Sequence, residues 1–190
     1  MSTVMETVQP KAEKEESAVE APLSVCFVCT GNTCRSPMAA AVTNALETAR
    51  RAALPKELQS LLPRALVADS RGLYADGGPI SEGALQALQE AEIPPVEGHD
   101  YRTHVSATID ETDAERFDLL CAVGARHAME LLLRFPQHAG KILRLPQEIP
   151  DPYGGDALTY RRCLAAITES VRELFFADSA PTEGKEHSEE

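Results

Sequence analysis

Five residues separate a cysteine from an arginine in the segment Cys29 to Arg35, and both side chains suit reactions at phosphorus. A thiol is a nucleophile as its thiolate, and a neighbouring guanidinium favours that charged form. The planar guanidinium of Arg35 also presents paired N–H donors that match two phosphate oxygens. The pair therefore predicts that Cys29 attacks a bound phosphorus atom and forms a phospho-cysteine intermediate.

The neighbouring residues predict the elements that position this pair. Residues 23–28 are apolar and β-branched, which indicates a buried strand. Ser36 and Pro37 are typical of a helix start, with Ser36 as N-cap and Pro37 at the first helical position. The free backbone N–H groups between strand and helix, with the positive helix end, would bind an anion. The expected phosphate-binding residues are Thr30, Gly31, Asn32, Thr33, Cys34, Arg35 and Ser36.

The overall composition excludes several classes of partner. The chain has 190 residues and a net charge of −12, which makes a nucleic-acid backbone an unsuitable partner. No apolar run reaches the length that spans a bilayer, and no basic-then-apolar secretion signal begins the chain. The five cysteines lack disulfide spacing, and we expect a cytoplasmic protein. No Cys/His grouping has metal-ligand spacing, so neither a metal nor a cofactor is expected.

The chain divides into three parts. Residues 1–22 and 178–190 are acidic and lack a hydrophobic period, and we interpret both as disordered tails. Residues 23–177 have the length and pattern of one domain with a full core, which we expect to be a monomer.

The body alternates strand-like and helix-like segments, which predicts an α/β fold with a four-stranded parallel sheet covered by helices on both faces. The expected strands are 23–28, 65–70, 117–123 and 141–145. The expected helices are 37–53, 56–62, one that follows the N-cap Ser81, 110–116, 125–135 and 156–176. Ligands of such sheets bind beyond the carboxyl ends of the strands. The loops that follow the first and fourth strands, which carry Cys29 and Asp151, should therefore meet at one end of the sheet.

The segment Cys29 to Pro37, Cys-Thr-Gly-Asn-Thr-Cys-Arg-Ser-Pro, resembles the signature loop of the low-molecular-weight protein tyrosine phosphatases. Within that family it is most similar to the protein-arginine phosphatase branch. A second match is Asp151-Pro152-Tyr153, and the resemblance covers about residues 23–177. It implies the three-layer, Rossmann-like fold of these phosphatases and a phosphorylated protein as substrate. It also implies that Ser36 eases thiolate departure and that Asp151 is first the proton donor and then the base.

Three positions bear on which phosphorylated residue is the substrate. Tyrosine-specific members of the family commonly have Ile or Leu at the position of Thr30, and a second aromatic residue after Tyr153, where this chain has Gly154 and Gly155. Phosphoarginine carries N–H donors that need acceptors when buried, and the Thr30 hydroxyl and the Asp151 carboxylate could accept them. We therefore expect phosphoarginine specificity from Thr30, with Tyr153 as a wall of the slot. Alternatively, Thr30 only bonds its own loop.

The resemblance also implies supporting residues. Asn32 would hold the loop in shape, with Ser70 and His104 as its hydrogen-bond partners. Arg71 stands where the family typically has alanine and could touch the rim of the site. His127 is expected at the surface or the rim.

The cysteines fall into two groups. Cys34 could form a reversible disulfide with Cys29 that protects the nucleophile, or it could simply fill a small buried space. Residues expected in the core are Cys26, Cys121 and Cys163.

Three other functions remain open. A protein-tyrosine phosphatase would use the same chemistry on a different leaving group. Arsenate reductases of this fold have a similar loop, but they relay oxidation through further cysteines, and here only the widely separated Cys121 and Cys163 follow. A non-catalytic phosphoprotein-binding module would be expected to lack Cys29, Arg35 or Asp151.

Overall fold

The computed structural model describes residues 21–59 and 62–177. The predicted tail at 178–190 lies outside the described residues, as does all but the last two residues of the predicted tail at 1–22. The elements, in chain order, are β1 (Leu23–Cys29), α1 (Arg35–Ala52), α2 (Lys56–Gln59), β2 (Leu66–Gly72), α3 (Glu82–Glu90), η1 (Tyr101–Thr103), α4 (Glu111–Arg116), β3 (Leu119–Ala122), α5 (Ala125–Arg134), η2 (Pro136–Lys141), β4 (Ile142–Arg144) and α6 (Ala157–Phe175).

The four strands form one parallel sheet in the order β2-β1-β3-β4, as the alternating pattern predicted. In the register, Val28 of β1 lies between Arg71 of β2 and Ala122 of β3. The central position of β1 explains why residues 25–29 are all buried. Its last residue, Cys29, stands opposite Gly72 of β2 and is buried as well.

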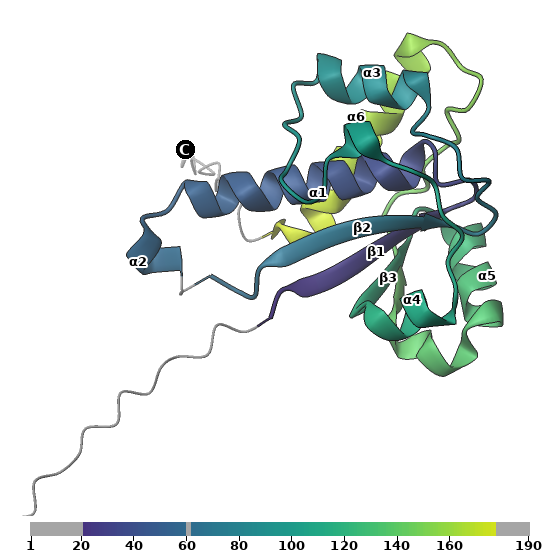
Figure 1. Cartoon of the computed structure of the whole chain (residues 1–190), viewed down its shortest axis with the longest axis horizontal. Helices are drawn as coiled ribbons and strands as arrows, with labels where there is room; N and C mark the ends of the chain where they lie inside the picture. The colour runs from purple at the N-terminus through teal and green to yellow at the C-terminus, as the bar shows by residue number, and fades with distance from the viewer. Residues whose placement is uncertain (1–20, 60–61, 178–190) are drawn as a thin grey trace, which may run out of the picture.

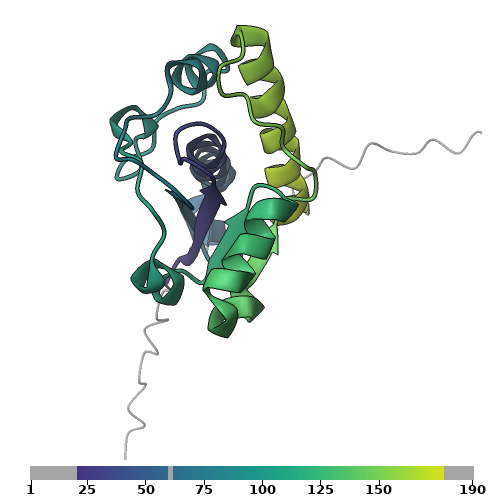
Figure 2. The ribbon, with the colours of Figure 1, turned by 90° about the vertical axis from the view of Figure 1, so that its right-hand side faces the viewer.

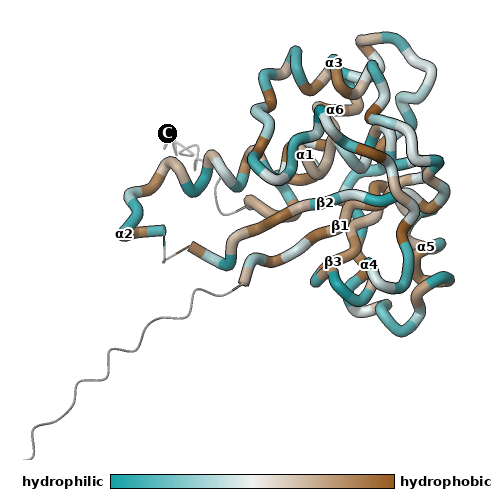
Figure 3. Tube along the Cα trace, in the orientation of Figure 1, coloured by the Kyte–Doolittle hydropathy of each residue, from teal (hydrophilic) through white to brown (hydrophobic). Residues whose placement is uncertain are grey.

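Helices cover both faces of the sheet, which confirms the predicted three layers. Figure 1 shows α1, α3 and α6 on one side of the strands, with α4 and α5 on the other. The first layer packs around a core that includes Phe27, Met38, Leu88 and Ile167. The second layer packs around a smaller core that includes Leu120 and Leu131. Hydrophobic colour predominates along β1, the central strand (Figure 3).

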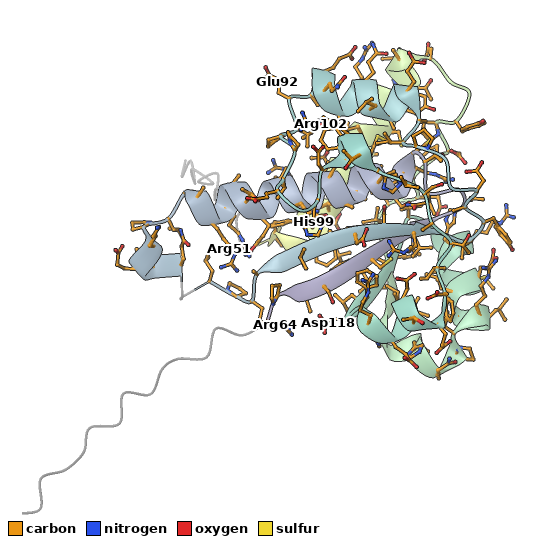
Figure 4. The ribbon with its side chains drawn as sticks, in the orientation of Figure 1. Arg51, Arg64, Glu92, His99, Arg102 and Asp118 are labelled. Atoms are coloured by element: carbon orange, nitrogen blue, oxygen red, sulfur yellow. The ribbon has the colours of Figure 1, made fainter. Side chains whose placement is uncertain are left out.

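The start of the sheet, opposite the end that carries Cys29, is closed by polar contacts. The Asp118 carboxylate accepts hydrogen bonds from the backbone N–H and the hydroxyl of Ser24, each 2.8 Å long. Arg64 lies 3.7 Å from the same carboxylate, and the two residues are neighbours in Figure 4. These contacts fix the first residues of β1, the strand that ends with Cys29.

The start of α1 differs from the prediction. The helix begins at Arg35, its N-cap is Cys34, and Pro37 is the third helical residue, so the assignment of Ser36 as N-cap is wrong. The Ser36 hydroxyl bonds the loop and the Cys29 thiol instead. The side chain is thus used by the site rather than by the helix.

Smaller differences concern the ends of elements. The third and fourth strands are shorter than expected. α2 spans Lys56–Gln59, and residues 60–61 of the helix predicted at 56–62 lie outside the described residues. Near the end of α1, Ala49 is exposed, whereas Glu47 is buried and pairs with Arg50 and Arg51.

Three helix starts follow the local rules. The side chains of Ser81, Asp110 and Asp156 each accept a hydrogen bond from a backbone N–H of the first turn. The N-cap at Asp156 also receives the Thr159 hydroxyl at 2.7 Å. In the described part of the chain, none of the helices combines the length and the apolar character needed to span a bilayer.

Candidate active site

The loop from Thr30 to Cys34 curls over the carboxyl end of β1, and Figure 2 looks onto this end of the sheet. The segment after β2 holds the start of the loop, because the N–H groups of Leu73 and Tyr74 donate to the carbonyls of Cys29 and Thr30, both at 2.8 Å. The loop therefore begins as an extension of the sheet and then turns into α1.

Gly72 permits this contact between β2 and the loop. A Cβ atom at Gly72 would lie 2.8 Å from the carbonyl oxygen of Thr30 and 3.1 Å from the backbone nitrogen of Asn32. A side chain at this position would have to displace the loop backbone. Glycine is thus required here by close approach.

The loop presents unpaired backbone donors. Within the described ranges, the N–H groups of residues 30 to 34 donate no hydrogen bond to the protein. The N–H groups of Arg35 and Ser36 belong to the first turn of α1, where a helix offers no partner. Free donors at a helix N-terminus suit the binding of an anion, which is the use that the sequence predicts for this segment.

The Cys29 thiol lies beneath these donors. Cys29 is 2% exposed, and its Sγ is 3.0 Å from the Ser36 Oγ. Ser36 Oγ also accepts a hydrogen bond from Asn32 Nδ2 at 3.0 Å and lies 3.2 Å from the Arg71 carbonyl. The hydroxyl has one proton, so it can donate to the carbonyl when Cys29 is a thiol and to Sγ when Cys29 is a thiolate. A thiolate has no proton of its own, which makes Ser36 its donor.

Asn32 organises the loop. Its backbone is left-handed, with φ of 57°, and the residue is fully buried. The side chain donates to Ser36 Oγ and, at 2.8 Å, to Ser70 Oγ, and it accepts from the Ala107 N–H at 3.0 Å. The contact with Ser70 is the one that the resemblance implied, and Ala107 is a further partner that the sequence did not reveal.

His104 reaches the loop through its backbone. Its Nε2 lies 2.8 Å from the carbonyl oxygen of Asn32, and because a carbonyl only accepts, the ring nitrogen is the donor. Burial lowers the pKa of His104, and the hydrogen bond to Asn32 partly offsets that effect. The histidine is thus next to Asn32 as expected, but it bonds the main chain rather than the side-chain amide.

Asp151 and Arg35 meet across the mouth of the loop. Nη2 of Arg35 is 2.6 Å from Oδ2 of Asp151, and Nη1 is 3.4 Å from the Ile149 carbonyl. Arg35 is 7% exposed, and its Nε is buried without a hydrogen bond to any described residue. The Asp151 side chain is half exposed. The two loops expected at one end of the sheet are therefore in contact, through residues 116 positions apart.

A cavity of about 550 Å³ opens above the loop. Cys29 and Arg35 line its floor, Asp151 lines its wall, and the exposed aromatic rings of Tyr74 and Tyr153 stand at its sides. Tyr153 is placed where the sequence predicted a wall. Tyr74 was not predicted, because nothing local distinguishes it. Its position comes from the contact of the segment after β2 with the loop.

The prediction that His127 lies at the surface or rim is wrong. His127 is 5% exposed, and its Nε2 lies 3.1 Å from the Thr30 Oγ1, which contacts the cavity. Burial and then the positive charge of Arg35 lower the pKa of His127. The ring is therefore neutral near pH 7, and its remaining nitrogen, Nδ1, has no partner among the described residues.

Two threonine hydroxyls border the cavity. Thr30 is joined to His127, whereas the Thr33 Oγ1 has only a 3.7 Å contact with the Cys34 sulfur. Both Thr30 and Thr33 line the cavity. The Thr33 hydroxyl is thus the less engaged of the two, and a substrate group could use it as an acceptor.

Cys34 points toward α3 and α6. Its Sγ lies 3.1 Å from the Ser81 hydroxyl and 3.7 Å from the Tyr160 hydroxyl. All five cysteines are free thiols and all are buried. Cys26, Cys121 and Cys163 are in the core as predicted, and burial raises the pKa of each, in Cys163 to about 12.

Arg71 does not reach the rim, contrary to expectation. It pairs with Asp113 at 2.9 Å and with Asp69 at 3.1 Å, and its guanidinium lies over the Phe117 ring. These partners belong to the face of the sheet that carries α4, away from the cavity. The bulky cation is accommodated there because two carboxylates neutralise it.

Comparison with known proteins agrees with the geometry of the site. A family model described as low molecular weight phosphotyrosine protein phosphatase matches residues 24–186. The protein-arginine-phosphatase of Bacillus subtilis (strain 168) is 29% identical over 160 residues, which cover 80% of this chain and 94% of that protein. The low molecular weight protein-tyrosine-phosphatase PtpB of Staphylococcus haemolyticus (strain JCSC1435) is 30% identical over 162 residues, covering 80% and 97%.

A solved structure shares the fold. It is the YwlE arginine phosphatase, as a cysteine-to-serine variant with a phosphorylated active-site serine. It aligns with a TM-score of 0.65 and 28% identity, and the alignment covers 80% of this chain and 92% of that one. The family model covers most of the chain, and the chain therefore belongs to the low molecular weight phosphotyrosine protein phosphatase family.

Proposed function

We propose that this protein phosphatase removes phosphate from protein phosphoarginine through a phospho-cysteine intermediate. One observation carries the proposal: the Cys29 thiol lies under a loop of unpaired N–H groups, with Arg35 and Asp151 at its mouth. A nucleophile, an anion cradle and a proton donor are the three parts that covalent phosphoryl transfer needs.

In the first step, the loop amides and Arg35 bind the phosphoryl oxygens. The Cys29 thiolate attacks phosphorus, a sulfur–phosphorus bond forms, and the bond from phosphorus to the leaving nitrogen breaks. Asp151 gives its proton to that nitrogen. Because Arg35 is paired with Asp151 before the reaction, part of its donor set must turn from the carboxylate to the phosphoryl group.

In the second step, the Asp151 carboxylate takes a proton from water, and the water oxygen attacks phosphorus. The sulfur–phosphorus bond breaks and phosphate leaves. Ser36 donates to the departing thiolate, since its hydroxyl is 3.0 Å from Cys29 Sγ. The phosphorylated serine in the variant YwlE structure supports a covalent intermediate of this kind.

The polar wall of the cavity supports phosphoarginine as the substrate. The guanidinium of phosphoarginine brings N–H donors into the slot, and unpaired donors are costly to bury. Three acceptors are available there: Asp151, Thr30 and Thr33. A phenyl ring would leave these acceptors without a partner. Phosphotyrosine is the second candidate, since relatives include tyrosine phosphatases and the Tyr74 and Tyr153 rings flank the cavity.

The decisive measurement is kcat/KM on matched phosphoarginine and phosphotyrosine peptides. Thr30→Val and Thr33→Val remove each hydroxyl with little change in shape, and Thr30→Ile adds apolar bulk. We expect the wild type to prefer phosphoarginine. In these variants the ratio of kcat/KM for phosphoarginine to that for phosphotyrosine should fall about tenfold, which corresponds to ~1.4 kcal/mol for a lost buried hydrogen bond. A wild-type preference for phosphotyrosine would refute the arginine assignment.

The chemistry has its own test. Cys29→Ser should abolish turnover, and Asp151→Asn should lower kcat strongly for a poor leaving group while the circular dichroism spectrum stays unchanged. Retained turnover in Cys29→Ser would refute the nucleophile. A mechanism that depends on a free thiol needs a reducing compartment, and we accordingly propose the cytoplasm as its location.

A further inference from the structure

We propose that the catalytic cavity continues into a flanking subsite between α3 and the start of α6, which binds the substrate chain beside the phosphorylated residue and favours a cationic side chain there. The inference rests on the proposed function only in assuming a phosphorylated protein as substrate. We define the flanking subsite by its lining residues, which are Ser81, Glu82, Gly83, Gln86, Tyr153, Gly154, Gly155, Ala157 and Tyr160.

The subsite adjoins the catalytic cavity. It is a hollow of about 420 Å³, and Ser81, Glu82 and Tyr153 line both this hollow and the catalytic cavity. The exposed Tyr153 ring is thus a partition between them, with Ser81 and Glu82 on the opposite wall. A peptide whose phosphorylated side chain enters the catalytic cavity has its next residues at this partition.

The walls suit an extended peptide. Gly154 is left-handed, with φ of 76°, and a side chain there would meet no atom within 4 Å. Gly154 therefore leaves room for a bound chain where a side chain would otherwise project, whereas the neighbouring Gly155 packs against Thr159 and donates its N–H to the Pro152 carbonyl. On the other wall, Gly83 lies directly against the Tyr160 ring, since an added Cβ would be 2.4 Å from it. The close approach of α3 to α6 makes this floor rigid.

The charges of the walls are unbalanced. Among the charged residues that line the catalytic cavity, Arg35 is the single cation, against the carboxylates of Asp76, Glu82 and Asp151. Asp151 pairs with Arg35, and Asp76 accepts from the Gly78 N–H and lies 3.4 Å from the Ser106 hydroxyl. Glu82 is exposed and, within the described ranges, makes no hydrogen bond or ion pair.

Of the three carboxylates, Glu82 is therefore the one without a partner in the described part of the chain, and it can contact a residue that flanks the phosphorylated one. It stands on the wall shared by both hollows, outside the floor that holds the phosphoryl group. An acidic residue beside the phosphorylated one would be repelled by it, and a lysine or arginine would be attracted. Since the chain as a whole carries a net charge of −12, the long-range field favours the same basic substrates.

Glu82 also has a local role that the test must separate from this one. It is the first residue of α3, where a negative charge is favourable near the positive helix end. Neutralising it is expected to lower the melting temperature slightly whether or not it contacts a substrate. A readout of selectivity, rather than of stability, is therefore needed.

The experiment compares kcat/KM for peptides with one phosphorylated residue flanked on both sides by lysine, alanine or glutamate. The peptides are made with phosphoarginine and, separately, with phosphotyrosine. Wild type should prefer lysine over glutamate flanks several-fold at low salt, and the preference should shrink at 1 M salt. Glu82→Gln should reduce it about threefold, the size of one exposed charge contact. The matched control is Glu173→Gln, an exposed carboxylate on α6 that lines neither hollow.

The outcomes separate the two proposals. A lysine preference that Glu82→Gln reduces supports the flanking subsite, whichever phosphorylated residue is hydrolysed. Equal kcat/KM values for lysine, alanine and glutamate flanks would overturn it. So would a lysine preference that Glu82→Gln and Glu173→Gln change by the same factor. If neither peptide series is hydrolysed, the proposed function fails. The subsite is then tested by calorimetric binding of the same peptides to Cys29→Ala. Equal affinity for the peptides with lysine, alanine and glutamate flanks would overturn it.

Discussion

Asn32 supports the anion-binding loop with both its backbone and its side chain. The left-handed backbone lets the chain turn toward α1, and the amide group joins the loop to β2 and to the segment at Ala107. Asparagine tolerates this conformation better than most residues because its short polar side chain can bond locally. The shape of the cradle therefore depends on one buried residue.

Substitutions at Asn32 separate these two contributions. Asn32→Ala leaves the Ala107 N–H without its buried partner and keeps the strained backbone, so we expect a loss of about 2–4 kcal/mol in the free energy of unfolding. Asn32→Gly should lose about 1 kcal/mol less, since glycine has no left-handed penalty. Urea unfolding measures both values. Equal losses would mean that the backbone conformation contributes nothing.

Two histidines make stability depend on pH. His104 and His127 have pKa values below the ordinary 6.5, chiefly because burial disfavours the charged ring, and Arg35 adds to this at His127. Below about pH 6.5 the unfolded chain binds more protons than the folded one. The contribution of these two histidines to the free energy of unfolding is therefore fully present above pH 6.5 and falls as the pH decreases toward 5.

The pH dependence can be assigned by substitution. The slope of the free energy of unfolding between pH 5 and 7 should reach at most about 1.4 kcal/mol per pH unit for each histidine. His127→Gln and His104→Gln should each reduce it, because each removes one ring whose pKa is lowered in the folded protein. Denaturant titrations at several pH values give the slope. An unchanged slope in both buried variants would contradict the assignment.

At the scale of elements, the site is built where β1, β2 and the start of α1 converge. The parallel register places Cys29 opposite Gly72, and the chain after β2 continues to bond the loop after β1. The loop is thus shaped by strand pairing as much as by its own residues. A change in β2 should consequently alter catalysis without touching a reacting group.

Gly72→Ala tests this dependence. The added methyl group would overlap the Thr30 carbonyl, and overpacking of this kind costs about 1–3 kcal/mol. We expect that loss of stability together with a clear fall in kcat/KM, because the loop amides move. Gly140→Ala is the control, since nothing lies within 4 Å of a Cβ there. A Gly72→Ala enzyme with wild-type kcat/KM would show that the loop does not need this contact.

At the scale of the molecule, one side of the sheet holds the larger core, and its helices also supply the walls of the cavity. The starts of α3 and α6 form the flanking subsite, and the N-terminus of α5 carries His127. The residues proposed for catalysis are Cys29 and Arg35, at the two ends of the first loop, and Asp151, in the loop after β4. The proposed site draws residues from most of the predicted domain, from Cys29 to Tyr160, and we propose that it needs neither predicted tail.

A shortened chain of residues 23–177 tests that boundary. We expect it to unfold within a few degrees of the full chain, to remain a monomer, and to keep kcat/KM on a neutral peptide. Calorimetry, sedimentation and steady-state kinetics provide the three readouts. Loss of activity with an unchanged melting temperature would assign a function to the acidic segments.

Three features could be predicted from the order of residues: the strand–loop–helix that carries Cys29 and Arg35, the alternating α/β pattern, and the meeting of the Asp151 loop with the first loop. These features follow from short-range spacing and from the rule that parallel strands end at one edge. The preference of serine for the N-cap position gave a wrong assignment at Ser36, because the Ser36 hydroxyl contacts the Cys29 thiol instead.

Which groups far apart in the chain share a hydrogen bond depends on the tertiary packing. Thr30 and His127 are 97 positions apart, Asn32 and Ala107 are 75 apart, and Cys34 and Tyr160 are 126 apart. Nothing in the local sequence distinguishes His127 from an exposed helix residue. A polar group in the interior must find a partner, and which partner it finds depends on how whole layers pack.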